Sequence, residues 1–259
     1  MLEYIKELSR IPAVSGNEDM VRDYLIKKIE KHASYEVDAL GNLLVFKQGK
    51  TRAKNKLMLA AHMDEIGFII THITEDGFLK FTTVGGIDSR VILGRSVEIG
   101  PEGVFGVMGV KPVHLVKKEA ENKMPDDDEL YIDIGAKDRE EALGKISLGD
   151  LAVFTGEPTE LGESLLKAKA LDDRAGCAIL LKMIESELEY DLNFAFTVQE
   201  EVGLRGAAAA AYAIKPDYAF VVEATTAADI AGVEEEKQVC ALGKGPAVSF
   251  MDRATVYDR

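Results

Sequence analysis

The sequence predicts an α/β protein into which a small β-barrel is inserted. Helical and strand-like patterns alternate at both ends of the chain, which indicates a mostly parallel sheet covered by helices on both faces. Between residues 71 and 162 the pattern changes to short β-type runs separated by glycine-rich turns, which is typical of a barrel or sandwich. We therefore expect residues 1–70 and 163–259 to form one domain and residues 71–162 to form an inserted one.

The N-terminal region predicts two helices and the first strands of the sheet. A helix is expected over residues 1–10, and Ser15 and Glu18 have the spacing of a capping box for a second helix over residues 19–32. The runs expected to form strands are "YEVDALGNLLVFKQG", as two short strands around a Gly-Asn turn, and "KLMLAAHMDEIGFIITHI", as one long central strand.

The remaining elements follow from the same periodicities. The expected barrel strands are "FLKFTTV", "VEIG", "VFGVMGV", "LYIDIGA" and "LAVFTG". After the barrel we expect a helix over residues 171–187, a buried strand over 192–200, an alanine-rich helix over 206–214 and another buried strand over 218–224.

Composition excludes several classes of function. With 45 acidic and 31 basic residues among 259, the formal charge of −14 repels nucleic-acid phosphates and anionic membrane surfaces. The N-terminus lacks the apolar core of a signal peptide, and no run reaches the ~18 apolar residues of a membrane helix, so we expect a cytoplasmic protein. Cys177 and Cys240 are 63 positions apart in apolar surroundings, which favours reduced, buried thiols.

Acidic residues and one histidine follow four of the apolar runs. They are His62 and Asp64, Asp172 and Asp173, Glu200 and Glu201, and Glu223. Any one alone has an ordinary structural explanation, such as a helix cap or a solvated strand end. Ligands of open α/β sheets bind beyond the carboxyl ends of the strands, so we expect the four groups to meet there. Their mutual repulsion predicts a bound cation.

The mixture of imidazole and carboxylate indicates zinc, cobalt or manganese rather than calcium or magnesium. A carboxylate able to bridge two ions suits a two-metal hydrolytic centre. Because adjacent residues of an extended chain point in different directions, Glu200 and Glu201 could divide the work between binding metal and taking a proton from water.

Four motifs, "AAHMDEIGF", "ALDDRAG", "VQEEVGLRGA" and "GKGPA", resemble in order those of the M42 metallo-aminopeptidases, which include the TET peptidases and some proteins labelled endoglucanase. The resemblance covers essentially the whole chain. It implies a phosphorylase/hydrolase-like α/β/α sandwich with two metal ions, an inserted β domain for assembly, removal of N-terminal residues from peptides, and a homo-oligomer between a dimer and a dodecamer.

The resemblance also implies roles for individual residues. His62 would bind one metal ion, Asp172 would bridge both, and Glu201 would bind the other. Glu200 would be the general base, and Asp64 would orient the histidine.

Further details of the resemblance concern neighbouring positions. The Asp172–Asp173 bond resembles a cis peptide of the family, and Glu223 stands where many members have an aspartate metal ligand. The family pattern also has a histidine downstream of "GKGPA", whereas all four histidines here lie at or before position 114, so we expect a truncated chain or a weakly held second metal. His72 and His114 are expected to have structural roles.

Two alternatives stay open at this point. One is a related co-catalytic metal hydrolase, such as a deacylase or a carboxypeptidase. The other is a non-catalytic assembly subunit, because the last histidine is absent from these 259 residues. A glycosidase is disfavoured because its two carboxylates must flank a sugar, while these are grouped for metal. The preferred N-terminal residue and the native metal do not follow from the sequence.

Overall fold

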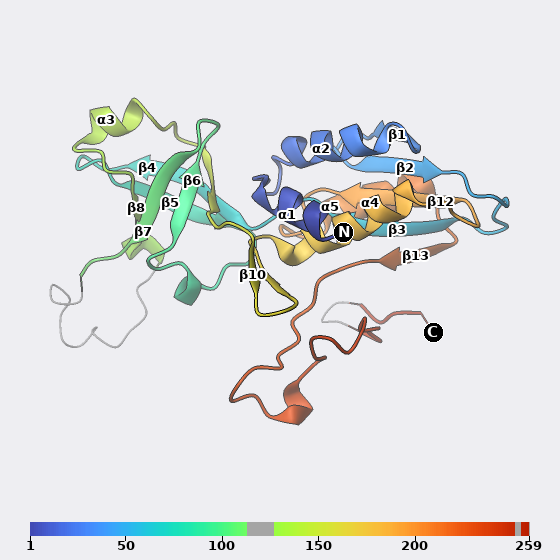
Figure 1. The fold of residues 1–259 in the computed structure, drawn as a ribbon. Coiled ribbons are helices and arrows are strands. Elements are labelled where there is room, and N and C mark those ends of the chain that lie inside the picture. Colours follow the sequence, from blue (N-terminus) through green and yellow to red (C-terminus); the bar gives the residue numbers. More distant parts are fainter. Residues whose placement is uncertain (113–126, 252–254, 259) are drawn as a thin grey trace. The chain divides into compact units, whose positions relative to one another are not determined.

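The computed structural model describes residues 1–112, 127–251 and 255–258, and the chain divides into two compact units (Figure 1). The first unit, Met1–Glu223, contains the named α-helices and β-strands. The second, Ala224–Arg259, contains a 3-10 helix at Glu235–Lys237 and an isolated bridge between Met251 and Val256.

A five-stranded sheet forms the centre of the first unit. Its strand order is β1 (Ser34–Val37), β2 (Leu43–Lys47), β12 (Leu192–Thr197), β3 (Leu57–His62) and β13 (Tyr218–Val221). The β1–β2 and β2–β12 pairs are antiparallel, and β12–β3 and β3–β13 are parallel. The expectation of a mostly parallel sheet holds except at β2, which forms a hairpin with β1 and runs opposite to the other four strands.

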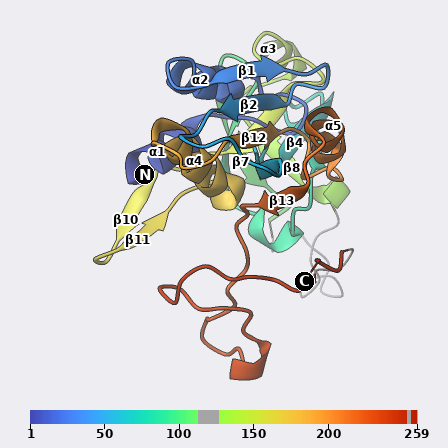
Figure 2. The same ribbon diagram turned by 90° about the vertical axis from the view of Figure 1, so that its right-hand side faces the viewer.

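Helices cover both faces of this sheet, as expected. On one face α1 (Leu2–Arg10), α2 (Asp19–Ile29) and α4 (Leu171–Glu185) pack against strand residues such as Leu43, Leu59 and Phe194. On the other face α5 (Arg205–Ile214) packs against residues of opposite parity, such as Leu44 and Met58. Figure 2 shows α1 and α4 on one side of the stacked strands and α5 on the other. The period of two along each strand thus divides the core between two helical layers.

The strand β13 is not buried, contrary to the sequence prediction. All four of its residues are exposed, including Tyr218 and Phe220. Its apolar composition indicates a central strand, but β13 pairs only with β3 in the described sheet and lies at the edge. Position in the sheet, which sequence periodicity does not report, decides its exposure.

The apolar run from 56 to 73 is not one strand. It forms β3 in the five-stranded sheet and β4 (Gly67–Ile73) in a separate closed barrel. The intervening residues carry two buried carboxylates, Asp64 and Glu65, whose hydrogen bonds interrupt the ladder.

The barrel confirms the expectation of a small β-barrel in the middle of the chain. Its closed order is β4, β5 (Leu79–Val84), β8 (Tyr131–Asp133), β7 (Val104–Gly109), β6 (Ser96–Ile99) and β9 (Leu151–Phe154). Short 3-10 turns at Ser89–Val91 and Asp127–Glu129 and the helix α3 (Arg139–Leu143) connect these strands. A hairpin, β10 (Thr159–Leu161) and β11 (Leu165–Lys167), follows the barrel.

The predicted capping box at α2 is wrong. Glu18 is the N-cap residue, but its side chain makes no capping bond to the helix. Instead Glu18 Oε1 accepts the amides of Gly16 and Gln199, and Ser15 Oγ donates to Asp64. The helix also ends at Ile29, before His32, which is exposed. In the described residues no helix is long and apolar enough to cross a membrane.

Candidate metal centre

Strand register brings three of the four predicted groups to one edge of the sheet. His62 ends β3 and lies opposite Thr197, the last residue of β12, so that Glu200 and Glu201 follow just beyond it. On the other side β13 pairs with β3 as far as Val221 and Ala60, which places Glu223 beside the same edge. The fourth group, Asp172 and Asp173, lies at this edge because α4 begins there.

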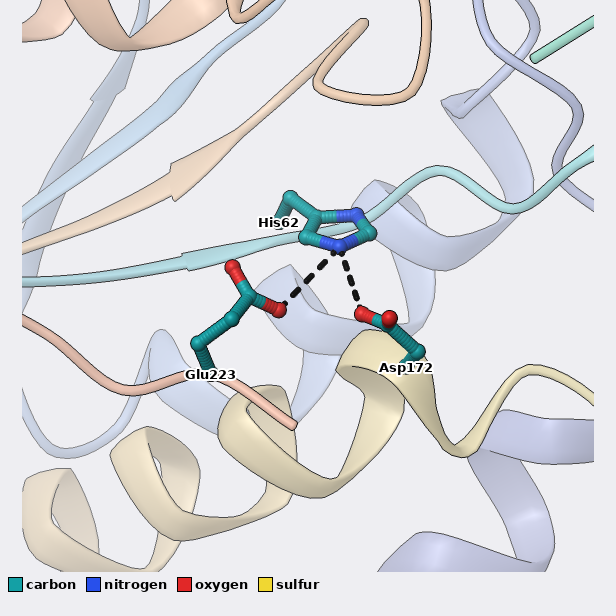
Figure 3. Close-up of side chains that lie close together, drawn as sticks. All are labelled: His62, Asp172 and Glu223. Atoms are coloured by element: carbon teal, nitrogen blue, oxygen red, sulfur yellow. Dashed lines mark hydrogen bonds and ion pairs between the residues drawn. The ribbon is translucent and has the colours of Figure 1, made fainter. Parts of the chain in front are cut away.

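His62 is the buried centre of the group, with 2 % of its surface exposed. Its Nε2 atom lies 3.0 Å from Asp172 Oδ1 and 3.4 Å from Glu223 Oε1 (Figure 3). Glu200 Oε2 is 3.9 Å from the same nitrogen. Glu201 joins a second arrangement, in which ligand atoms of His62, Glu200 and Glu201 all lie within 4.8 Å of one another.

The donor atoms of this group fit a cation. His62 Nδ1 faces two acceptors of Asp64, the main-chain oxygen at 3.1 Å and Oδ1 at 3.4 Å, so the neutral ring carries its proton there. Nε2 then presents a lone pair to two carboxylate oxygens. Three acceptors facing one another require a proton or a metal ion between them, and imidazole with carboxylates is a set that zinc, cobalt and manganese accept.

The carboxylates of the site have strongly perturbed acidities. Burial, followed by the negative charge of Glu223, raises the pKa of Asp173 to about 8. Burial, together with the charges of Asp172 and Glu200, raises the pKa of Glu201 to about 7. For His62 burial alone would lower the pKa, but Asp172, Asp64 and Glu223 together raise it. The site therefore holds more negative charge than its one histidine can balance.

No lysine or arginine forms an ion pair with any of these acidic residues in the described part of the chain. The six are Asp64, Asp172, Asp173, Glu200, Glu201 and Glu223, and the ion pairs found for them go to His62 alone. Only Asp64 and Asp173 are fully buried, but six carboxylates close together without a lysine or arginine repel one another, which is the pattern expected where a metal ion supplies the missing charge.

Asp173 has a different place from its neighbour Asp172. Asp173 is fully buried, and its carboxylate accepts the main-chain amides of His62 at 3.3 Å and Gly176 at 3.0 Å. The peptide bond between the two aspartates is cis, as the resemblance implies. The two residues have non-helical backbone angles, so the regular part of α4 starts after them.

Asp64 joins the histidine to the two adjacent glutamates. Its carboxylate accepts the amides of Glu200 at 3.0 Å and Glu201 at 3.1 Å, in addition to its contacts with His62. The other histidines take no part in this centre: His72 lies exposed on β4, and His114 is outside the described residues.

Sequence reasoning missed a second group of buried charges beside the site. Glu65 Oε1 lies 2.6 Å from Lys169 Nζ and 3.4 Å from Arg174 Nη2, and it also accepts the amide of Ala13. Both Glu65 and Arg174 directly follow site residues in the chain, Asp64 and Asp173. A signal was present, because charged residues within apolar motifs are rarely buried unless paired.

The fold places a group of residues that could hold a metal ion at one edge of the sheet, and comparison with known proteins identifies the family. The model of the M42 glutamyl aminopeptidase family matches residues 41–259. An aminopeptidase from the archaeon Desulfurococcus kamchatkensis is 40 % identical, with a TM-score of 0.88 over 95 % of this chain and 68 % of that one.

Two further relatives agree with this result. The TET1 peptidase of Pyrococcus horikoshii, which can assemble into a tetrahedron or a large octahedral shell, is 40 % identical, with a TM-score of 0.78 over 88 % of this chain and 72 % of its own. The lysyl aminopeptidase of Pyrococcus furiosus is 34 % identical over 95 % of this chain and 72 % of its own. The chain belongs to the M42 glutamyl aminopeptidase family and is a peptidase.

Proposed function

We propose that the protein is a metal-dependent aminopeptidase that releases N-terminal residues from peptides. The observation that carries the proposal is the convergence of His62 Nε2 with the carboxylates of Asp172 and Glu223, at distances of 3.0 and 3.4 Å, in a member of the M42 family. No lysine or arginine of the described residues pairs with these carboxylates, so the site has the charge and the donors for divalent ions.

We assign the ligands to two divalent ions, of zinc, cobalt or manganese. His62 and Glu223 would hold one ion, Glu201 the other, and Asp172 would lie between them. When bound, the ions would polarise the scissile carbonyl and make water more acidic.

Glu200 is the best candidate for the general base. Its side chain is 30 % exposed, so water can reach it, and it is 3.9 Å from His62 Nε2, further than Asp172 or Glu223. Burial and the charges of Asp64 and Asp172 raise its pKa, which makes the carboxylate a better proton acceptor. In this role Glu200 takes a proton from water and then gives one to the leaving amine.

The excess of carboxylates also suits the substrate. A peptide's free α-amino group is positively charged at neutral pH, and the site edge is acidic with no described lysine or arginine paired to it. Attraction between the amino group and these carboxylates would favour substrates with an unblocked N-terminus over acylated ones.

We further propose a phosphorylase/hydrolase-like α/β/α sandwich for the catalytic part, residues 1–70 and 163–259, with residues 71–162 as an inserted domain for self-assembly. Helices on both faces of the five-stranded sheet and the closed barrel support an inserted domain, whose first strand, β4, begins at Gly67, just before the proposed boundary. Assembly of the related TET1 peptidase into closed shells supports a homo-oligomer.

A panel of substrates tests the proposed function. We expect hydrolysis of aminoacyl amides and short peptides, no hydrolysis of N-acylated peptides or of C-terminal residues, loss of activity with a chelator, and its return with zinc, cobalt or manganese. Elemental analysis of the purified protein would report the number of ions per chain. Preferred cleavage of N-acyl substrates would favour a deacylase, and an inactive protein without metal would favour a non-catalytic subunit.

A further inference from the structure

The two adjacent glutamates lie on a turn whose main-chain amides are held from outside the turn. We call residues 198–204 the glutamate turn; it connects β12 to α5. Four successive amides, those of residues 198 to 201, donate to side chains elsewhere in the chain, at 3.0 to 3.1 Å. The acceptors are Asn42 for the first amide, Glu18 for the second and Asp64 for the third and fourth.

All three acceptor side chains are buried: Glu18 is 4 % exposed, and Asn42 and Asp64 are fully buried. They come from three separate segments of the chain, before α2, before β2 and after β3. Buried acceptors that converge on one turn hold it more rigidly than solvent would, because each lost bond would leave an unpaired buried group.

Asn42 forms hydrogen bonds at the start of the glutamate turn and in the first turn of α5. Its Oδ1 accepts the amide of Val198, and its Nδ2 donates to the main-chain oxygen of Gly206 at 3.0 Å. The carboxamide of Asn42 carries an acceptor and a donor on separate atoms, which lets one short side chain make both contacts. A Cβ atom on Gly206 would lie 2.4 Å from Asn42 Oδ1, so the close approach also requires a glycine there.

Glu18 has no evident reason to be buried for stability. Among the described residues it forms no ion pair, and its Oε1 accepts only main-chain amides, those of Gly16 at 2.7 Å and Gln199 at 3.0 Å. Burial and the nearby charge of Asp64 raise its pKa, which shows that its surroundings disfavour the carboxylate. Gln199 has a φ of 54°, in the left-handed region that residues other than glycine rarely occupy. The hydrogen bond from its amide to Glu18 helps to hold this unfavourable backbone conformation.

We propose that Glu18 is a positioning residue of the metal centre, which fixes the glutamate turn with Asn42 as its second support. The inference rests on the proposed function, in which Glu201 binds metal and Glu200 takes a proton. Rotation of the turn about Gln199 would redirect both side chains at once, so loss of the Glu18 bond should weaken metal binding and slow turnover together.

Three substitutions of Glu18 distinguish the effect of its acceptor's position from the effect of its negative charge. Glu18→Ala removes the acceptor. Glu18→Gln keeps an oxygen at the same reach, which suffices because both amides bond to one atom, Oε1, but it removes the charge. Glu18→Asp keeps the charge but draws the acceptor back by one methylene. If position is what matters, the glutamine variant will retain more function than the aspartate variant.

The matched control is Asp138→Ala. Asp138 is also an N-cap carboxylate that accepts a main-chain amide, that of Glu141 at 2.9 Å, but it lies at α3 among the barrel strands. Its removal should lower the stability of the protein and leave the metal centre intact, so it shows what loss of an N-cap carboxylate alone does.

The experiment measures zinc affinity by equilibrium dialysis with elemental analysis, thermal unfolding of the metal-free protein, and kcat and KM on an aminoacyl substrate. We expect Glu18→Ala to weaken the binding of the more weakly held ion and to lower kcat, each by roughly 10- to 100-fold, as for other residues that orient ligands. Glu18→Asp should show a smaller loss of the same kind, and Glu18→Gln should restore most of both.

Unchanged zinc affinity in Glu18→Ala would overturn the inference, as would a glutamine variant no better than the aspartate variant. If the alanine variant does not fold, the comparison of aspartate with glutamine still decides. Failure of the proposed function is separate, because it would appear in the unsubstituted protein as absence of zinc binding or of aminopeptidase activity.

Discussion

Two groups of charged side chains in this protein, one buried and one partly exposed, are built in opposite ways. In the first, Glu65 faces two cations, Lys169 and Arg174, at 2.6 and 3.4 Å. In the second, the metal centre, His62 faces four carboxylates, that of Asp64 at Nδ1 and those of Asp172, Glu200 and Glu223 at Nε2. In the first group lysine and arginine balance the carboxylate, with one positive charge in excess, whereas no described lysine or arginine balances the carboxylates of the second.

Sequence neighbours supply both groups. Asp64 points toward the metal centre and Glu65 toward the cations, as expected for adjacent residues on an extended chain. In the same way Asp173 lies beneath His62, while Arg174 reaches Glu65 and the main-chain oxygens of Leu8 and Ile11. Each of these two short motifs therefore contributes one residue to the group balanced by lysine and arginine and its neighbour to the unbalanced metal centre. The difference suggests that charge imbalance, rather than burial, marks the site.

The largest expected effect is on turnover, at Glu200. The change Glu200→Gln keeps the size of the side chain but removes its ability to take a proton. We expect kcat to fall by roughly 100- to 10,000-fold, while zinc content stays the same. Steady-state kinetics and elemental analysis on the same sample measure both. An unchanged kcat would show that Glu200 is not the general base, and it would weaken the argument that the unbalanced group is a catalytic site.

The next effect is on stability, in the balanced group. Glu65→Gln leaves two buried cations without their carboxylate, so we expect the free energy of unfolding to fall by about 3 to 5 kcal/mol. Urea denaturation measures the change. The control is Glu75→Gln, which breaks the exposed pair with Arg139 at 3.0 Å and should change stability by less than about 1 kcal/mol. Equal effects of the two substitutions would contradict the distinction between the groups.

The smallest expected effect is an increase in the free energy of unfolding, caused by a substitution in the metal centre. Glu223→Gln removes one of the carboxylates around His62, so the metal-free protein should become more stable, by about 1 kcal/mol. With zinc present the order should reverse, because the unsubstituted protein binds the ion more tightly and gains more stability from it. Urea denaturation with a chelator and with zinc provides the comparison. A less stable metal-free variant would show that this carboxylate is balanced after all.

The candidate site was largely predictable, and the reasons are local. Each of the four groups of candidate site residues comes just after an apolar run, and strands of one sheet end at a common edge. The closed barrel was predictable for a similar reason, since short strands with glycine turns leave a regular pattern. The supports of the site were not: Ser15 and Glu18 have the spacing of a helix cap, and only their contacts with Asp64 and Gln199 reveal another role.

The sequence by itself determined the alternation of elements, the apolar face of each strand, and the residue types that a metal centre needs, because these depend on neighbours a few positions apart. Only the tertiary structure decided that the run from 56 to 73 divides between sheet and barrel, that β13 lies at an edge, and that Glu65 rather than Asp64 meets the cations. Those outcomes depend on contacts between segments more than 100 residues apart, such as Glu65 with Lys169 and Asn42 with Gly206. A pattern of neighbouring residues cannot predict such contacts, because they form and stabilise the protein only when the chain has folded.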